Sequence, residues 1–306
     1  MNPLRRIQLP LIVGLCLLAG SVHAHGPLHG EIEEISARLS RTSDPSELLL
    51  RRADLYRLDG NPDAALADLA TAARIVPVPD GVEWIRSRVL MDLGRPADAI
   101  PHLNRWLELH PSHESGLALR AQAHELSHDP ESAIRDYTVA ITAAAQPSVD
   151  LYLARARAQR QLGSDRWPEA LRGLDDGMSR LGILVTLQLE AISLEESLGR
   201  IDAALSRLDT LNQLSSRHER WLVRKAELLA RAGRPGEARR SWKAALEACQ
   251  ALPERLRTMP ATRELELSIR RNLSEDELPA ATQTAVVRSS PNPGIRLLPE
   301  GTKLTP

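Results

Sequence analysis

The sequence repeats itself about every 34 residues. Six stretches place a small residue, a turn residue and a second small residue in the same order. The turn position is held by Gly60, Gly94, His128, Gly163, Gly199 and Gly233, so successive copies are 34, 34, 35, 36 and 34 residues apart. A fixed period of this size is typical of stacked arrays of short structural units.

Each copy divides into two runs with helical periodicity. Each run has about a dozen residues, with apolar residues at the spacing of one helix face. A Gly-x-Pro or Gly-x-x-Asp break separates most pairs of runs, as in 60–62 and 199–202. Glycine ends a helix in the left-handed conformation, and proline begins the next helix, where no amide partner is needed. One such pair cannot bury its own apolar face, so the pairs are expected to stack.

The repeat resembles the tetratricopeptide repeat. The first unit, 46–79, carries the matching small, aromatic, turn and closing residues at Ala53, Tyr56, Gly60, Ala65, Leu69, Ala72 and Pro77. The second unit, 80–113, repeats the pattern with Ser87, Leu90, Gly94, Ala99, Leu103, Trp106 and Pro111. The resemblance covers 46–252. It implies an all-α fold, a right-handed α-solenoid of about six stacked helix-turn-helix repeats, that binds a protein or peptide and is not an enzyme.

Three units depart from the pattern. His128 stands where glycine is usual in the third unit. The fourth unit carries two extra residues, which we place within 164–168, and the fifth has polar Glu195 where an aromatic residue is usual.

The N-terminus has the features of a bacterial signal peptide. Arg5 and Arg6 precede an apolar run at 9–19, and Val22-His23-Ala24 fits a small-x-small cleavage site. The run is short for a membrane span. We expect cleavage of 1–24, export to the periplasm or the exterior, and no later membrane span. An uncleaved membrane anchor is the alternative.

The remaining segments are expected to close the array at both ends. Residues 25–45 contain a candidate capping helix at 30–41, with Ile32, Ile35 and Leu39 on one face. Residues 253–274 contain a second candidate at 261–272. Prolines punctuate 275–306 without a helical pattern, which predicts a disordered tail.

Composition excludes several classes of function. The formal net charge is −1, whereas a nucleic-acid-binding surface is markedly basic. Phe is absent, so Leu and Ala must fill the core, which favours helices. Cys249 is the single cysteine after cleavage and is expected to be a small buried hydrophobe. No nucleophile–base pair, phosphate loop or spaced Cys/His set is apparent, so we expect no catalysis and no cofactor.

The resemblance implies a partner-binding groove, because the first helix of each unit lines the concave face in this family. By position, the groove residues are Asp54, Arg57, Trp84, Arg88, Met91, Gln122, Glu125, Arg157, Arg160, Ser193, Glu196, Glu227 and Arg231. Arg88, Arg157 and Arg160 are expected to hold carboxylates of an extended peptide. Trp84 is of the type that anchors interfaces. A solvated helix face without a specific ligand is the alternative.

Histidines suggest a different function. Cleavage after Ala24 leaves His25 with a free α-amine and His29 four residues later, a donor set that suits Cu(II). A metal-binding accessory protein using His25 and His29 is therefore the alternative function. His124 and His128 are also four residues apart, but His124 occupies the position of Tyr56 and is expected to pack instead.

Overall fold

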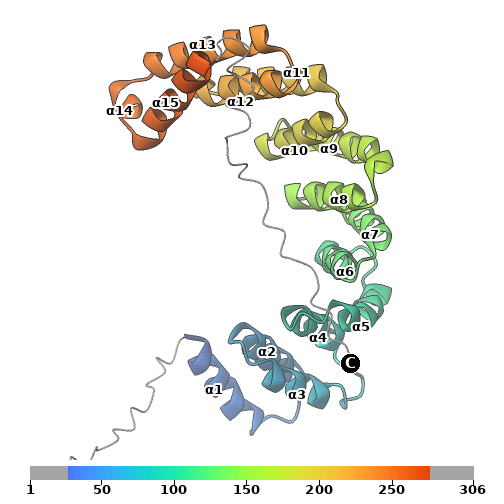
Figure 1. The fold of residues 1–306 in the computed structure, drawn as a ribbon. Helices are drawn as coiled ribbons and strands as arrows, with labels where there is room; N and C mark the ends of the chain where they lie inside the picture. The colour runs from blue at the N-terminus through green and yellow to red at the C-terminus, as the bar shows by residue number, and fades with distance from the viewer. Residues whose placement is uncertain (1–26, 276–306) are drawn as a thin grey trace, which may run out of the picture. The chain divides into compact units, whose positions relative to one another are not determined.

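The computed structural model describes residues 27–275. The predicted signal peptide, His25 and residues 276–306 of the predicted tail lie outside the described residues. Within 27–275 every regular element is a helix, and no strand is present. The all-α repeat fold is therefore confirmed (Figure 1).

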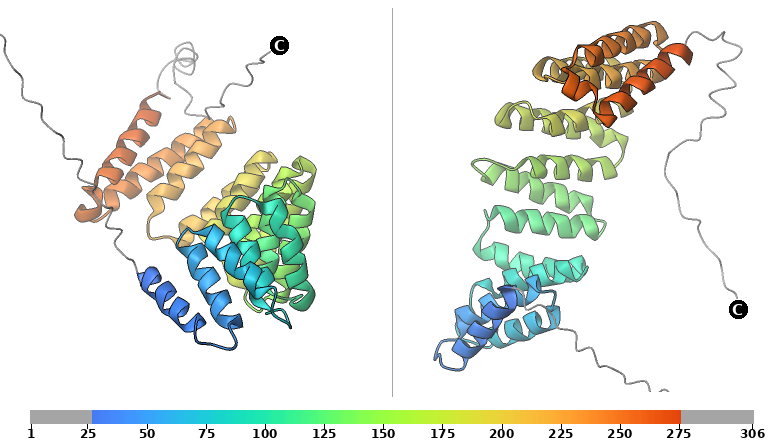
Figure 2. Two further views of the ribbon diagram at one scale, coloured as in Figure 1. Left: turned by 90° about the horizontal axis from the view of Figure 1, so that it is seen from below. Right: turned by 90° about the vertical axis from the view of Figure 1, so that its left-hand side faces the viewer.

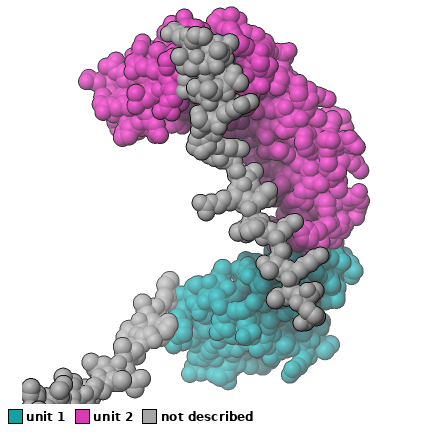
Figure 3. Space-filling model, viewed as in Figure 1, with its two compact units in different colours: residues 1–109 teal, residues 110–306 magenta. Residues whose placement is uncertain are grey.

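The chain forms two compact units, with the boundary between Leu109 and His110 (Figure 3). The boundary falls inside the array predicted for 46–252. The described part of unit 1 consists of a single helix followed by two helix pairs: α1 (Pro27–Leu39), α2 (Ser46–Leu58), α3 (Pro62–Ala72), α4 (Gly81–Asp92) and α5 (Pro96–Leu109).

Unit 2 continues with four helix pairs and two closing helices. In each pair the two helices pack against each other, and the right view of Figure 2 shows the helices of this unit stacked in layers. The elements are α6 (Glu114–Leu126), α7 (Pro130–Ala143), α8 (Val149–Gln161), the 3₁₀ turn η1 (Ser164–Arg166), α9 (Trp167–Leu181), α10 (Val185–Ser197), α11 (Ile201–Leu214), α12 (His218–Arg231), α13 (Pro235–Ala251), α14 (Glu254–Arg257) and α15 (Pro260–Glu275).

The repeated turn position has a positive φ in all six repeats. Gly60 has φ 75°, and His128 has φ 60° in the third unit, although it carries a side chain. Asp129 follows His128 and accepts a hydrogen bond from the amide of Ser132, which caps α7. The turn geometry thus survives the replacement of glycine, at the modest cost of a side chain in this region.

The small residues of the repeat lie where the helices approach one another. The two small positions of most units are almost completely buried, at Ala53, Ala65, Ala99, Ala121, Ala133, Ala156, Ala170, Ala226 and Ala238. Leu and Ile side chains fill the spaces between helices, as the lack of phenylalanine requires. Because such interiors are close-packed, a larger residue at these positions must displace its neighbours.

Charged pairs tie the first helix of a pair to the second. Arg52 of α2 donates two hydrogen bonds of 2.7 Å to Asp68 of α3. Arg120 of α6 and Asp136 of α7 show the same geometry two repeats later, with two hydrogen bonds of 2.7 Å. Both carboxylates are almost buried, so each depends on its arginine for compensation.

Helices also cover the two ends of the described chain. α1 begins at Pro27 and ends at Leu39, slightly earlier than the predicted 30–41. Its Ile32 and Ile35 pack with Leu55 of α2. α15 extends over Pro260–Glu275, longer than the predicted 261–272, and its Ile269 is buried in the core formed with α12 and α13.

Candidate partner-binding face

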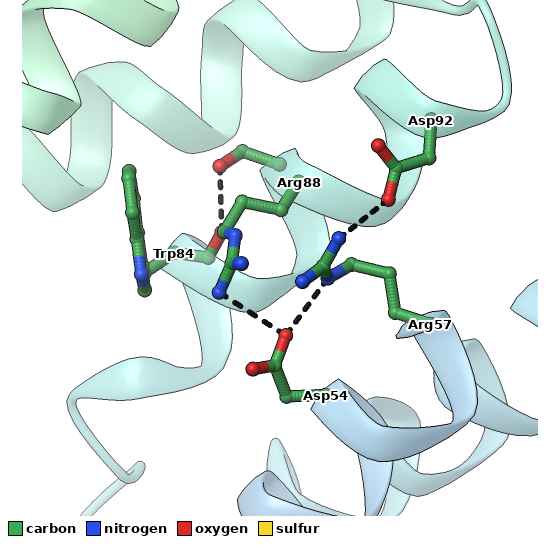
Figure 4. Close-up of polar contacts among 6 residues, drawn as sticks. Asp54, Arg57, Trp84, Arg88 and Asp92 are labelled. Carbon is green, nitrogen blue, oxygen red and sulfur yellow. Dashed lines mark hydrogen bonds and ion pairs between the residues drawn. The ribbon is translucent and has the colours of Figure 1, made fainter. Parts of the chain in front are cut away.

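The predicted groove residues of unit 1 form one polar network around Asp54. Arg57 donates to Asp54 through Nε at 2.8 Å, and Arg88 donates to the same oxygen through Nη1 at 3.1 Å. Arg57 also reaches Asp92 at 2.8 Å. Figure 4 shows both guanidinium groups directed at Asp54. The network joins α2 to α4, the first helices of two successive pairs.

Trp84 is anchored within the same unit. Its ring stacks on that of Trp106 in α5, with centroids 5.7 Å apart and an interplanar angle of 29°. The guanidinium of Arg88 lies 5.7 Å from the centroid of the Trp84 ring. Stacking and cation–π contacts of this kind each stabilise by roughly 0.5–1.5 kcal/mol. Trp84 is thus a half-buried, fixed aromatic surface, and Met91 lies half-buried one turn beyond Arg88.

In unit 2 the central contact of this face joins α6 to α8. Nε and Nη2 of Arg157 each donate to the carboxylate of Glu125 at 3.1 Å. Tyr137 of α7 also donates its hydroxyl to Glu125, at 2.7 Å. Burial, reinforced by the contact with Glu125, raises the pKa of Tyr137. The side chain of Glu125 is only 8% exposed, whereas that of Arg157 is 62% exposed.

Arg160 connects α8 to α10. Its Nη1 donates to Glu190 at 2.8 Å and to the hydroxyl of Ser193 at 3.3 Å. An open hollow of about 530 Å³ lies beside these groups, lined by Leu153, Arg157, Arg160, Gln161 and Glu190. The two predicted groove arginines of α8 therefore border one concavity.

Further along unit 2, α10 is joined to α12. Arg231 donates to Glu196 at 2.8 Å, and Arg224 lies 3.7 Å from the other oxygen of Glu196. Gln122 of α6 and Glu227 of α12 expose their side chains on the first helices. We call the groove positions of unit 2 the first-helix face: Gln122, Glu125, Arg157, Arg160, Ser193, Glu196, Glu227 and Arg231.

These contacts give the arginines partners within the chain. Arg88, Arg157 and Arg160 were expected to hold carboxylates of an extended peptide, which stays a prediction, and each also holds a carboxylate of a neighbouring helix pair. Stacking brings residues about one period apart within reach, and the partners lie 30 to 34 positions away. The acids Asp92 and Glu190 and the base Arg224 were missed, although charges of opposite sign at one-period spacing signal such pairs.

Among residues 27–275 no group of three or more His, Cys, Asp or Glu side chains is placed to hold a metal ion. His29 lies on α1, 3.6 Å from Glu33, while His25 lies outside the described residues. The copper site at His25 and His29 stays a prediction. His124 is half-buried, and burial lowers its pKa, as expected of a packing residue.

Cys249 is completely buried, as expected for a small hydrophobe. Burial raises the pKa of its thiol to about 11, so the reactive thiolate is disfavoured. None of the helices described between 27 and 275 is long and apolar enough to cross a membrane.

Comparison with known proteins identifies the repeat. Residues 86–149 match the family model described as tetratricopeptide repeat. No curated protein matches the sequence. The structure is similar to the C-terminal part of a TPR repeat-containing protein from Cytophaga hutchinsonii, with a TM-score of 0.60 and 13% identity, over 78% of this chain and 94% of that chain. A tetratricopeptide repeat protein from Parabacteroides merdae has a TM-score of 0.48 and 17% identity, over 80% of this chain and 93% of that chain. Residues 86–149 thus carry tetratricopeptide-repeat sequence, and the structure shares the helical-repeat fold of a TPR repeat-containing protein.

Proposed function

We propose that this protein is a non-catalytic scaffold or adaptor that binds a protein or peptide partner on its first helices. Tetratricopeptide-repeat folds generally mediate protein–protein interaction. The observation that carries the proposal is the hollow beside α8 and α10, with Arg157 and Arg160 at its border. Concave surfaces lined by first helices are the usual binding surfaces of solenoids.

The ion pairs prepare this face for binding. A guanidinium has five N–H donors, and Glu125 accepts two of those of Arg157. The others are available to carbonyl or carboxylate oxygens of a partner. Because Glu125 fixes the orientation of Arg157, less conformational entropy is lost when the partner binds. The class of partner that fits is an extended peptide segment, which offers a backbone carbonyl at every residue.

The fixed arginines also limit what the face selects. Arg157 and Arg160 are balanced by Glu125 and Glu190, so the hollow has little net charge. Recognition therefore depends on directed hydrogen bonds and on the apolar wall at Leu153 more than on long-range attraction. A nucleic-acid partner is not proposed, because the chain as a whole has a net charge of −1.

Two variants test the proposal once the partner has been captured from the host's envelope fraction and identified. The double variant Arg157→Glu with Arg160→Glu should weaken partner affinity by at least about tenfold, as expected when interface arginines are reversed. Arg172→Glu, at an exposed position of the second helix α9, is the matched control and should bind normally. Loss of binding in the control together with normal binding in the double variant would refute the proposal.

A charge-swapped variant separates binding from folding. Glu125→Arg combined with Arg157→Glu keeps an ion pair between α6 and α8 but reverses the exposed charge. We expect a melting temperature closer to wild type than that of Arg157→Glu alone, with partner affinity still reduced.

We further propose that the protein acts outside the cytoplasm, an inference supported by the residue pattern of 1–24.

A further inference from the structure

A second hollow lies within unit 2, away from the first-helix face. It has a volume of about 210 Å³ and is formed by α7, α8, η1 and the start of α9. A polar cavity needs only about 15 Å³ to hold a water molecule, so this one has room for a larger group. Gln159 of α8 lines it and is only 3% exposed.

Gln159 is a buried polar side chain whose Oε1 has no hydrogen-bond partner. Leu90 and Leu229 occupy the same position in the second and sixth repeats, and both are buried in the apolar core. In the fifth repeat Glu195 is buried as well; Arg207 donates to its Oε1 at 2.8 Å, while its Oε2 has no hydrogen-bond partner. A buried amide oxygen without a partner is unfavourable, and such groups are rare in folded proteins. The fold alone does not account for glutamine here.

The fourth repeat also has a longer connection between its two helices, and this connection borders the same hollow as Gln159. The two residues that lengthen this unit fall in the connection from α8 to α9, which forms the turn η1. Arg166 of η1 lines the hollow and pairs with Glu169 of α9 at 3.1 Å. The longer connection and the side chain of Gln159 thus both line one cavity.

The charges around the hollow balance. Arg135 and Arg166 carry two positive charges, and Glu131 and Glu169 carry two negative charges. The two glutamates would repel a carboxylate ligand, and the two arginines would repel an ammonium ligand. A neutral group that both donates and accepts hydrogen bonds is repelled by neither pair. Ile134 and Leu162 supply an apolar wall for its aliphatic part.

We propose that this hollow binds a carboxamide, the side chain of an asparagine or glutamine in a partner segment, and that Gln159 is the residue that recognises it. Two carboxamides pair reciprocally, because each offers an N–H donor and a carbonyl acceptor. The terminal torsion of glutamine is soft, so Gln159 can turn its amide to meet the ligand. This site goes beyond the proposed function and uses no residue of the first-helix face.

Nuclear magnetic resonance of the ¹⁵N-labelled mature chain tests the proposal. The probe is the tripeptide acetyl-Gly-Asn-Gly methyl ester, compared with the same peptide carrying Asp or Leu in the centre. We expect the asparagine peptide to shift the side-chain amide resonances of Gln159 saturably. The aspartate and leucine peptides should bind at least about tenfold more weakly, the loss expected when a buried polar group is left without its partner. Absence of a saturable shift, or equal shifts with all three peptides, would overturn the proposal.

Gln159→Leu supplies the second arm, and its binding is followed through the backbone amide of Leu162. This variant should melt at the same or a higher temperature, because leucine fills the position in other units, while losing affinity for the asparagine peptide at least about tenfold. A lower melting temperature would show that Gln159 serves the fold, and unchanged affinity would show that it does not bind the peptide; either result rejects the proposal. Arg231→Glu on the first-helix face should leave this affinity unchanged, so failure here is distinguishable from failure of the proposed function.

Discussion

Arg157 of α8 holds the carboxylate of Glu125, 32 residues earlier on α6, with two hydrogen bonds of 3.1 Å. Similar contacts join α8 to α10 through Arg160 and Glu190, and α10 to α12 through Arg231 and Glu196. Each contact spans two successive helix pairs. The side chains that we propose to face a partner therefore also help to set the spacing of the stacked pairs within unit 2.

The buried pair of Arg120 and Asp136 yields a stability prediction. Arg120→Ala leaves the carboxylate of Asp136 buried without its two hydrogen bonds, so the free energy of unfolding should fall by about 3 kcal/mol. Urea unfolding measures the change. The double variant with Asp136→Ala is the control and should recover much of the loss, because no uncompensated charge remains. A single variant within about 1 kcal/mol of wild type would contradict this account.

Two helical glycines make a matched comparison. A Cβ added at Gly177 of α9 would lie 2.9 Å from the ring of Tyr152, whereas at Gly236 of α13 nothing lies within 4 Å. Gly177→Ala should therefore destabilise by about 1–3 kcal/mol, the usual cost of overpacking. Gly236→Ala should be neutral or stabilise by up to about 1 kcal/mol, since alanine favours helix. Thermal melting of both variants checks the prediction, and equal melting temperatures would rule out the tight contact at Gly177.

His124 predicts a dependence of stability on pH. Burial lowers its pKa in the folded state, and Arg120 and Arg135 act in the same direction, against the opposing carboxylates of Asp136 and Asp129. The unfolded chain therefore binds a proton more readily, and stability should fall as pH drops through about 6.5. Melting temperatures at about pH 7.5 and pH 5.5 should differ more in the wild type than in His124→Gln. If both proteins lose the same stability, His124 does not contribute.

The repeat pattern was sufficient to predict the helix pairs and their turns. The position of Gly60 recurs at His128, and His128 takes the same left-handed conformation. The repeat period identifies this position, because the turn requires the same backbone conformation whichever residue occupies it. The small residues likewise marked the close helix contacts, as buried Ala53 and Ala156 show.

Side-chain pairing across the stack was not predictable in the same way. Whether Arg157 reaches a partner peptide or Glu125 depends on the offset between α6 and α8, which is set by the packing of the intervening α7. The partnerless Oε1 of Gln159 was also missed, since glutamine at one repeat position looks like an ordinary departure until its surroundings are known.

Export predicts a defined mature N-terminus. If 1–24 is a signal peptide, protein recovered from the host's extracytoplasmic fraction should begin at His25, because signal peptidase cuts after the small residue Ala24. N-terminal sequencing decides this. Replacing Ala24 with a large residue such as Tyr should block the cut and leave the unprocessed chain. Protein that begins at Met1 in the membrane fraction would instead support the anchor alternative.

Site-specific photo-crosslinking in the native host shows whether the first-helix face binds the partner. A photoreactive amino acid is placed at Gln122 of α6 or Glu227 of α12, both exposed on that face, and at Arg172 of α9 as the control. No ion pair of the stacked helices is disturbed by these replacements. We expect covalent adducts to one and the same partner from Gln122 and Glu227 and none from Arg172. Adducts from Arg172, with none from the two first-helix positions, would contradict this expectation.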